Sequence, residues 1–319
     1  MRKIYLFLPT DDYGEKIFQN IENEKVKFLK IKKIYKKFLR VYFSYKISRY
    51  INLPFKFKIF KNVLKINKLQ DSEQNYFIFF DNTPWMIDNR FIYILKKKYP
   101  KSKIILYLWN TLDKVFYEKI KKFTFDKIIT FDKQDSIKYD FEYYPQVHSR
   151  KLLEKYKNTE LTEEVIFIGK DKDRIKILNN IFQFLEKLKI GPNYFYIVKD
   201  KKKYSRDLYI YNSLYNEYLS YEIVLKKLSS SRVILDVTKE NQEGLTLRVL
   251  ESLFLNKKVI TNNLGIKKYE FYNKNNIYIL EENNIDLKEF LKKEYININE
   301  DIKNKYDVNS WFNFILNNI

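Results

Sequence analysis

Apolar residues in this chain gather in short unbroken runs, and longer amphipathic stretches separate these runs. Unbroken runs of β-branched and aromatic residues are typical of strands that a parallel sheet buries on both faces. We expect strands at Lys3–Leu8, Tyr76–Phe80, Lys103–Leu108, Lys127–Thr130, Val165–Ile168, Tyr194–Val198, Val233–Val237, Lys258–Thr261 and Ile277–Leu280.

The stretches between these runs carry apolar residues at the spacing of a helix with one buried face. Helices are expected at Asn89–Lys98, Arg174–Leu188, Tyr221–Leu228, Leu245–Leu255 and Val308–Ile319. Strands that alternate with helices form right-handed βαβ units, and such units build doubly wound parallel sheets. The pattern therefore predicts an α/β fold.

The alternation breaks at about residues 149–163. The strand-like Phe141–Tyr144 ends at Pro145, a polar run follows, and a new strand begins with the sequence VIFIG. A chain of 319 residues is long enough for two domains that each bury a core. We therefore expect two Rossmann-like domains, at residues 1–150 and 160–305, with a C-terminal helix at 306–319 that packs back toward the first domain.

Composition removes several kinds of chemistry. The chain has no cysteine, which excludes disulfides and thiolate catalysis, and its single histidine, His148, argues against a histidine-rich metal site or a Ser-His-Asp triad. No apolar run approaches the roughly 18 residues that a membrane span needs. The first residues, MRKIYLFLPTDD, match a strand better than a signal peptide.

A glycine-containing motif follows the expected strand Val233–Val237. The loop from Thr238 to Gly244 comes first, and the sequence EGLTLRVLE begins within it at Glu243. In open α/β sheets, ligands bind outside the carboxyl ends of the strands, where this loop belongs. A helix that begins at Gly244 or Leu245 points free N–H groups and a positive dipole end at a bound diphosphate.

A second glutamate of the motif, Glu251, lies eight residues beyond Glu243, which is about 12 Å along a helix axis. That span is comparable to a nucleoside diphosphate measured from its ribose to the attached sugar. Two carboxylates at this spacing suit sugar hydroxyls at one end and ribose hydroxyls at the other. The alternative is a structural helix that carries two solvated glutamates.

The sequence EGLTLRVLESLFLNKKVITNN resembles the E-x7-E segment of retaining GT-B glycosyltransferases, such as glycosyltransferase family 4 and related bacterial polysaccharide and lipopolysaccharide enzymes. The resemblance implies that Glu243 lies beside the donor sugar and that Glu251 binds the ribose. It also implies that the backbone of Gly244, Leu245 and Thr246 meets the phosphates. The family's usual EGFG reads EGLT here, so the contacts of the first turn differ.

The strand VIFIG, which ends at Gly169, adds a second fragment of the same resemblance. Lys170 and Arg174 follow it, where the family places two cations that hold the donor diphosphate; Arg174 lies one position early. Two cations stabilise the charge that develops on a leaving diphosphate. We take Glu243, Lys170 and Arg174 as catalytic candidates and add Gly169 and Thr238 to the donor site. Because these cations take the diphosphate charge, neither a metal nor a cofactor is expected.

The first domain offers polar residues that follow its expected strands. Such residues lie at the carboxyl ends of a parallel sheet, where they either bind an acceptor or cap the next helix. The acceptor-side candidates are Asp11, Asp12, Gly14, Asp81, Asn82 and Asn110.

The resemblance implies a GT-B architecture in which two Rossmann-like domains face a central cleft. The implied activity is transfer of a sugar from a nucleotide-sugar donor to a surface glycan, a lipid-linked polysaccharide or lipopolysaccharide, with retention of configuration. Two alternatives stay open, a non-catalytic scaffold of glycan assembly and a basic nucleic-acid-binding protein.

Residues 25–70 hold fifteen lysines and arginines and no acidic residue, in a chain whose net charge is +21. Aromatic and aliphatic residues interleave with these cations. The mixture is typical of docking to an anionic membrane, of nucleic-acid binding, or of a solvated helical face. Membrane docking is favoured over nucleic acid, because an enzyme with a lipid-linked acceptor must reach the membrane. We expect a cytoplasmic protein that is peripheral on the inner face of the cytoplasmic membrane.

Overall fold

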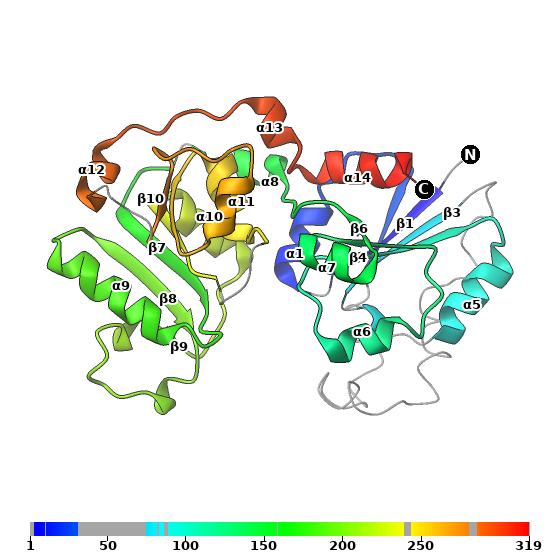
Figure 1. The fold of residues 1–319 in the computed structure, drawn as a ribbon, viewed down its shortest axis with the longest axis horizontal. Coiled ribbons are helices and arrows are strands. Elements are labelled where there is room, and N and C mark those ends of the chain that lie inside the picture. The colour runs from blue at the N-terminus through cyan, green and yellow to red at the C-terminus, as the bar shows by residue number, and fades with distance from the viewer. Residues whose placement is uncertain are drawn as a thin grey trace. The chain divides into compact units, whose positions relative to one another are not determined.

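The structure, a computed structural model, describes residues 3–9, 11–30, 75–81, 83–85, 89–157, 159–238, 244–280 and 286–318. The chain forms two compact units, which we call the first unit (Met1–Pro145 with Trp311–Ile319) and the second unit (Gln146–Ser310). Each unit contains one six-stranded parallel sheet with helices around it (Figure 1). Within the residues described, no helix has the length and apolar character of a membrane span.

The sheet of the first unit has the strand order β2-β1-β3-β4-β5-β6, and every neighbouring pair is parallel. Its strands are β1 (Lys3–Leu8), β2 (Val26–Lys30), β3 (Asn75–Phe80), β4 (Lys103–Leu108), β5 (Lys127–Thr130) and β6 (Glu142–Tyr143). Its helices are α1 (Asp12–Phe18), the 3-10 helix η2 (Thr83–Trp85), α5 (Asn89–Lys98), α6 (Lys114–Ile120), α7 (Lys133–Tyr139) and most of α14 (Val308–Asn317).

Aspartates that follow strands of the first sheet begin three of its helices. Asp11 accepts a hydrogen bond from the backbone N–H of Gly14 at 2.7 Å, and Asp113 accepts one from Phe116 at 2.7 Å. Asp132 caps α7 in the same way. A side-chain oxygen at this position satisfies an N–H group that the helix itself leaves without a partner.

Aromatic packing holds the last helix on the first unit. Trp311 of α14 is fully buried, and its ring lies 5.1 Å from that of Phe18, 4.8 Å from that of Tyr107 and 6.1 Å from that of Phe80. Edge-to-face and tilted ring contacts of this kind add to the free energy of burial. Trp311 therefore belongs to the core of the first unit, as do the buried Phe312 and Ile315 that follow it.

The sheet of the second unit has the strand order β12-β11-β10-β7-β8-β9, again all parallel. Its strands are β7 (Glu163–Lys170), β8 (Asn193–Val198), β9 (Leu214–Tyr215), β10 (Ser231–Asp236), β11 (Lys258–Thr261) and β12 (Ile277–Ile279). Its helices are α8 (Arg150–Glu154), α9 (Ile175–Lys187), α10 (Tyr221–Ser229), α11 (Leu247–Leu255), α12 (Leu287–Lys292), α13 (Glu300–Asn304) and the 3-10 helices η3 (Lys201–Lys203), η4 (Tyr211–Ser213) and η5 (Leu264–Lys268).

Numbered from β7, the strands of the second unit follow the Rossmann order 3-2-1-4-5-6. The order reverses between β7 and β10, and the crevice at such a reversal is where doubly wound sheets bind ligands. The two parallel sheets confirm the predicted fold class, α/β with two doubly wound units. They also bring β7 and β10, which are far apart in sequence, side by side.

The basic segment at residues 25–70 overlaps the structure at one element. Its first part forms β2, which pairs with β1 at the edge of the first sheet, with Val26 opposite Ile4. Residues 31–70, on which the membrane prediction mainly depends, lie outside the described residues.

Candidate functional site

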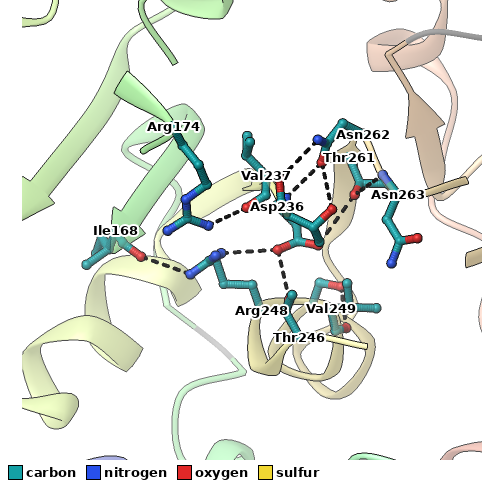
Figure 2. A network of polar contacts seen from close by, with 12 residues as sticks. Ile168, Arg174, Asp236, Val237, Thr246, Arg248, Val249, Thr261, Asn262 and Asn263 are labelled. Carbon is teal, nitrogen blue, oxygen red and sulfur yellow. Dashed lines mark hydrogen bonds and ion pairs between the residues drawn. The ribbon is translucent and has the colours of Figure 1, made fainter. Parts of the chain in front are cut away.

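Two arginines and a buried aspartate gather at the carboxyl ends of β7 and β10, at the reversal point of the second sheet (Figure 2). Asp236 is the last residue of β10. Arg174 precedes α9, and Arg248 lies in the first turn of α11. The sheet topology thus brings three segments of the chain to one place.

Asp236 is fully buried, and each of its partners lies on another element. Its Oδ1 accepts a hydrogen bond from the hydroxyl of Thr246 at 2.8 Å and lies 3.3 Å from Nε of Arg248. Its Oδ2 accepts a hydrogen bond from Thr261 of β11 at 3.4 Å. A buried carboxylate needs such partners, so Asp236 fixes the start of α11 against the ends of two strands.

The contact with Asp236 also moves the start of α11 from the predicted position. The helix was expected to begin at Gly244 or Leu245, but it begins at Leu247. Thr246 has extended backbone angles, and its hydroxyl binds Asp236 instead of capping the helix. The first-turn N–H groups therefore lie two to three residues later in the sequence than predicted.

The side chain of Arg248 is only partly buried. It is 17% exposed and lies over the ring of Phe167, with 5.2 Å between the guanidinium carbon and the ring centroid. Its Nη1 donates a long hydrogen bond of 3.4 Å to the carbonyl of Ile168. A Cβ at Gly169 would lie 3.2 Å from Nη1, so the glycine makes room for the arginine.

Arg174, one of the predicted diphosphate ligands, is 7% exposed and binds backbone carbonyls. Its guanidinium donates to Asp171 at 3.0 Å, to Lys170 at 2.5 Å and to Val237. Burial, together with the nearby Arg248, lowers its pKa to about 10, so it stays charged at neutral pH. Arg174 therefore joins the end of β7 to the end of β10.

The other predicted donor-side residues fall into two groups. Lys170 is exposed at the end of β7, with Nζ 5.0 Å from the ring centroid of Tyr218. Thr238 is 5% exposed, and its backbone N–H donates to the side-chain oxygen of Asn262 at 2.8 Å. Gly244 and Leu245 are buried just before α11. Glu243 lies outside the described residues.

Glu251 lies one turn further along α11 than Arg248 and is 2% exposed. It accepts a hydrogen bond from the hydroxyl of Tyr221 at 2.6 Å, and its Oε1 lies 3.9 Å from Nε2 of His148. Burial raises its pKa to about 7. The ribose contact of Glu251 stays a prediction, and the structure places its carboxylate among side chains of the second unit.

Among the acceptor-side candidates of the first unit, the structure brings Asp81 and Asn110 together. Nδ2 of Asn110 donates to Oδ2 of Asp81 at 2.7 Å, across the carboxyl ends of β3 and β4. Asp11 caps α1, while Asp12 is exposed and lies 3.9 Å from Lys16.

Gly14 is the remaining described acceptor-side candidate. A Cβ there would lie 2.6 Å from that of Pro9 and 2.7 Å from the ring of Trp109. The absence of a side chain at Gly14 thus lets α1 approach both residues. Asn82 lies outside the described residues.

Two residues of the site were not predicted, Arg248 and Asp236. Asp236 ends the strand before the motif and Arg248 lies within it, and the single charged residue of the sequence LTLRVL was the signal that pointed to Arg248. In the part of the chain that the structure describes, no three His, Asp or Glu side chains are grouped as metal ligands.

No protein-family model matches the chain, and no curated protein matches it in sequence. Among solved structures, it is similar to the Glycosylation Associate Protein (Gap123) complex from Streptococcus agalactiae, with a TM-score of 0.46 and 16% identity over 81% of this chain and 55% of that chain. It is also similar to the catalytic domain of Starch Synthase IV from Arabidopsis thaliana bound to ADP and acarbose, with a TM-score of 0.42 and 9% identity over 83% of this chain and 71% of that one.

The chain therefore spans about half the length of the first of these two proteins. Both TM-scores lie below 0.5, so the fold assignment rests on the strand order of the two sheets.

Proposed function

We propose that the chain is a GT-B glycosyltransferase that transfers a sugar from a nucleotide-sugar donor to a surface glycan. The second unit binds the donor, and the diphosphate of the donor lies at the reversal point between β7 and β10. The observation that carries this proposal is the partly exposed side chain of Arg248, which Asp236 orients beside the start of α11.

Arg248 supplies the chemistry that a diphosphate requires. A planar guanidinium donates parallel hydrogen bonds to phosphate oxygens, and a charge-assisted bond is stronger than a neutral one. The N-terminus of α11 adds N–H groups and the positive end of the helix dipole at the same place. Asp236 forms an ion pair with Arg248 on the side of Nε, and Ile168 accepts a long bond from Nη1, so the ligand contact in this proposal falls chiefly to Nη2.

Lys170 and Glu243 complete the proposed donor site. Lys170 is exposed at the end of β7, the strand that adjoins β10 at the reversal point. Together with Arg248 it stabilises the negative charge that the diphosphate gains as its bond to the sugar breaks. Glu243 faces the donor sugar, as the family resemblance implies. Retention of configuration and independence from metal belong to the same proposal.

The acceptor belongs to the first unit in this proposal. Asp81 and Asn110 offer a carboxylate and an amide to sugar hydroxyls at the carboxyl ends of β3 and β4. The acceptor is a lipid-linked glycan, and the basic residues of segment 25–70 hold the enzyme on the inner face of the cytoplasmic membrane. A GT-B arrangement, in which the two units face a shared cleft, follows from the same family resemblance.

A second candidate is a non-catalytic scaffold of glycan assembly. The burial of Glu251 favours it, because the resemblance places a ribose-binding carboxylate where the structure has one that contacts Tyr221. Such a protein keeps the fold without turning over a nucleotide sugar.

A panel of UDP-, GDP-, CMP- and dTDP-sugars in thermal-shift measurements tests the proposal, followed by nucleotide-release assays with glycan acceptors. We expect at least one nucleotide sugar to raise the melting temperature and to release its nucleotide faster when acceptor is present. Binding without release under any condition supports the scaffold. No stabilisation by any member of the panel contradicts the transferase and leaves the scaffold as the remaining candidate.

A further inference from the structure

Three buried side chains, Glu251, Tyr221 and His148, are joined in a row by polar contacts in the second unit, from α11 to the segment before α8. We call them the buried network. Glu251 accepts a hydrogen bond from the hydroxyl of Tyr221 on α10 at 2.6 Å, and that hydroxyl also contacts Nε2 of His148. Tyr221 and His148 are fully buried, and Glu251 is 2% exposed. Because a hydroxyl has one proton, Tyr221 accepts from His148 when it donates to Glu251.

His148 lies where two passages of the polypeptide meet. The chain enters the second unit after Pro145 and leaves it after Ser310. The backbone N–H of His148 donates to Tyr306 at 2.9 Å, and its carbonyl accepts from Val308 at 3.0 Å. These bonds form a parallel bridge between the entering and the leaving segment.

The other end of the buried network, Glu251, lies on the helix that carries Arg248. Glu251 is three residues after Arg248, so the two side chains are neighbours along one side of α11. Asp236 fixes the first turn of this helix through Thr246 and Arg248. The bond from Tyr221 to Glu251 fixes the following turn, and α11 is thereby held at two successive points.

The charged and titratable groups around Glu251 come from four elements. They are Tyr221 on α10, His148 on the entering segment, Arg248 on its own helix and Asp236 on β10. A carboxylate with 2% exposure has little surface for ribose hydroxyls, and a buried carboxylate without hydrogen bonds is costly. The surroundings of Glu251 therefore suit a structural link better than a ligand contact.

We propose that Glu251 is a positioning residue that, through Tyr221 and His148, ties α11 to the entering segment and so fixes Arg248 at the diphosphate site. This inference rests on the proposed function, because it assigns to Arg248 the contact with the donor diphosphate. It gives Glu251 a role other than the ribose contact that the family resemblance implies.

Two substitutions distinguish the positioning role of Glu251 from a ribose contact, because the two roles predict opposite orders for the loss of nucleotide affinity. Tyr221→Phe removes the hydroxyl that connects Glu251 to His148, so it should weaken nucleoside diphosphate binding by about threefold to tenfold. Glu251→Gln keeps an oxygen that accepts from Tyr221, so it should change the affinity by less than about twofold. A ribose-binding Glu251 predicts the reverse order. Tyr76→Phe is the matched control, because Tyr76 is fully buried in the first unit and its hydroxyl has no hydrogen-bond partner among the residues that the structure describes.

The measurement is isothermal titration calorimetry with UDP, GDP, ADP and CDP and with their 2′-deoxy counterparts. We expect Tyr221→Phe to weaken both members of a ribo–deoxy pair equally and Glu251→Gln to leave their affinity ratio unchanged. If Tyr221→Phe does not fold, His148→Leu removes the contact between Nε2 of His148 and the hydroxyl of Tyr221 and takes its place.

Three results overturn the inference. The first is a loss in Glu251→Gln confined to the ribonucleotide, which makes Glu251 a ribose ligand and leaves the proposed function standing. The second is a Tyr221→Phe variant that binds as well as Tyr76→Phe. The third is wild-type protein that binds none of the nucleotides, which overturns the proposed function together with the inference.

Discussion

The carboxyl ends of the two sheets carry different chemistry. In the second unit they hold two guanidinium groups, and a fully buried carboxylate orients one of them, Arg248. In the first unit they hold aspartates that cap helices and the pair of Asp81 with Asn110. Guanidinium groups suit phosphates, whereas carboxylates and amides suit hydroxyls. The proposed function assigns the anionic donor to the first kind of site and the neutral sugar acceptor to the second.

The two units also differ in the contacts that stabilise them. Asp236 in the second unit has three polar partners, so charges and hydrogen bonds join β10, β11 and α11. In the first unit, Trp311 and Tyr107 are packed ring against ring, and their Nε1 and hydroxyl have no hydrogen-bond partner among the described residues. Burial raises the pKa of Tyr107 well above its usual value. Aromatic packing stabilises the first unit where polar contacts stabilise the second.

The largest effect is expected from Trp311→Ala, which removes a fully buried ring from the first unit. Loss of a buried tryptophan costs about 3–5 kcal/mol of unfolding free energy. Chemical denaturation followed by hydrogen exchange should place the loss in the first unit, including β1, β3 and β4. A loss confined to the second unit contradicts the assignment of the last helix to the first.

The next effect is expected from Asp236→Asn, which leaves Arg248 without its counter-charge. Breaking a buried ion pair from one side costs about 3 kcal/mol, less where the partner is partly exposed. Denaturant unfolding measures the cost, and nucleotide affinity should fall with it. Unchanged stability would mean that Asp236 does not hold the start of α11.

The pH dependence of the unfolding free energy tests the burial of His148 and Glu251, because the two groups change stability in opposite directions as the pH rises. Burial lowers the pKa of His148 from 6.5 to about 4, so the unfolded chain binds more protons between these values and stability rises with pH. Burial raises the pKa of Glu251 from 4.5 to about 7, so the folded chain binds more protons and stability falls as pH rises. The two trends offset each other between about pH 4.5 and 6.5.

Glu251→Gln should therefore reveal the trend of His148. Its stability relative to wild type should increase from pH 4.5 to 7, by at most about 1.4 kcal/mol per pH unit. Thermal or denaturant unfolding across this range measures the difference. His148→Gln should show the opposite slope, and parallel curves for both variants would contradict the burial of these groups.

The smallest effect is expected from Asp81→Asn, the first unit's counterpart of Asp236→Asn. The amide oxygen still accepts from Asn110, so unfolding free energy should change by no more than about 1 kcal/mol. The same denaturant titration used for Asp236→Asn measures it. An equal loss of unfolding free energy in Asp81→Asn and Asp236→Asn would contradict the difference between the carboxyl ends of the two sheets.

The sequence was informative wherever a strand is buried on both faces. Unbroken apolar runs predicted β1, β4 and β11 to the residue, because such runs have no polar face to place at the surface. β2 was missed because its sequence VKFLK alternates lysines with apolar residues inside a basic run. β9, with two residues, is too short to leave a pattern.

The candidate site was only partly predictable, because its decisive contacts join distant segments. The motif located the loop and α11, but the pairing of Asp236 with Thr246 and Arg248 depends on β10 lying beside the helix start. The burial of Glu251 depends in turn on Tyr221, thirty residues earlier, and on His148. No local spacing encodes these contacts.

The most direct test of the proposed diphosphate site is calorimetric titration of wild type, Arg248→Gln and Arg232→Gln with UDP, GDP, ADP and CDP. Arg232 is the matched control, an arginine at the other end of β10 whose side chain is 52% exposed and lies 3.4 Å from Glu164. We predict that Arg248→Gln loses at least about tenfold in affinity for the nucleotide that binds wild type, while Arg232→Gln binds like wild type. Equal affinity in all three proteins would contradict a diphosphate site at the reversal point of the second sheet.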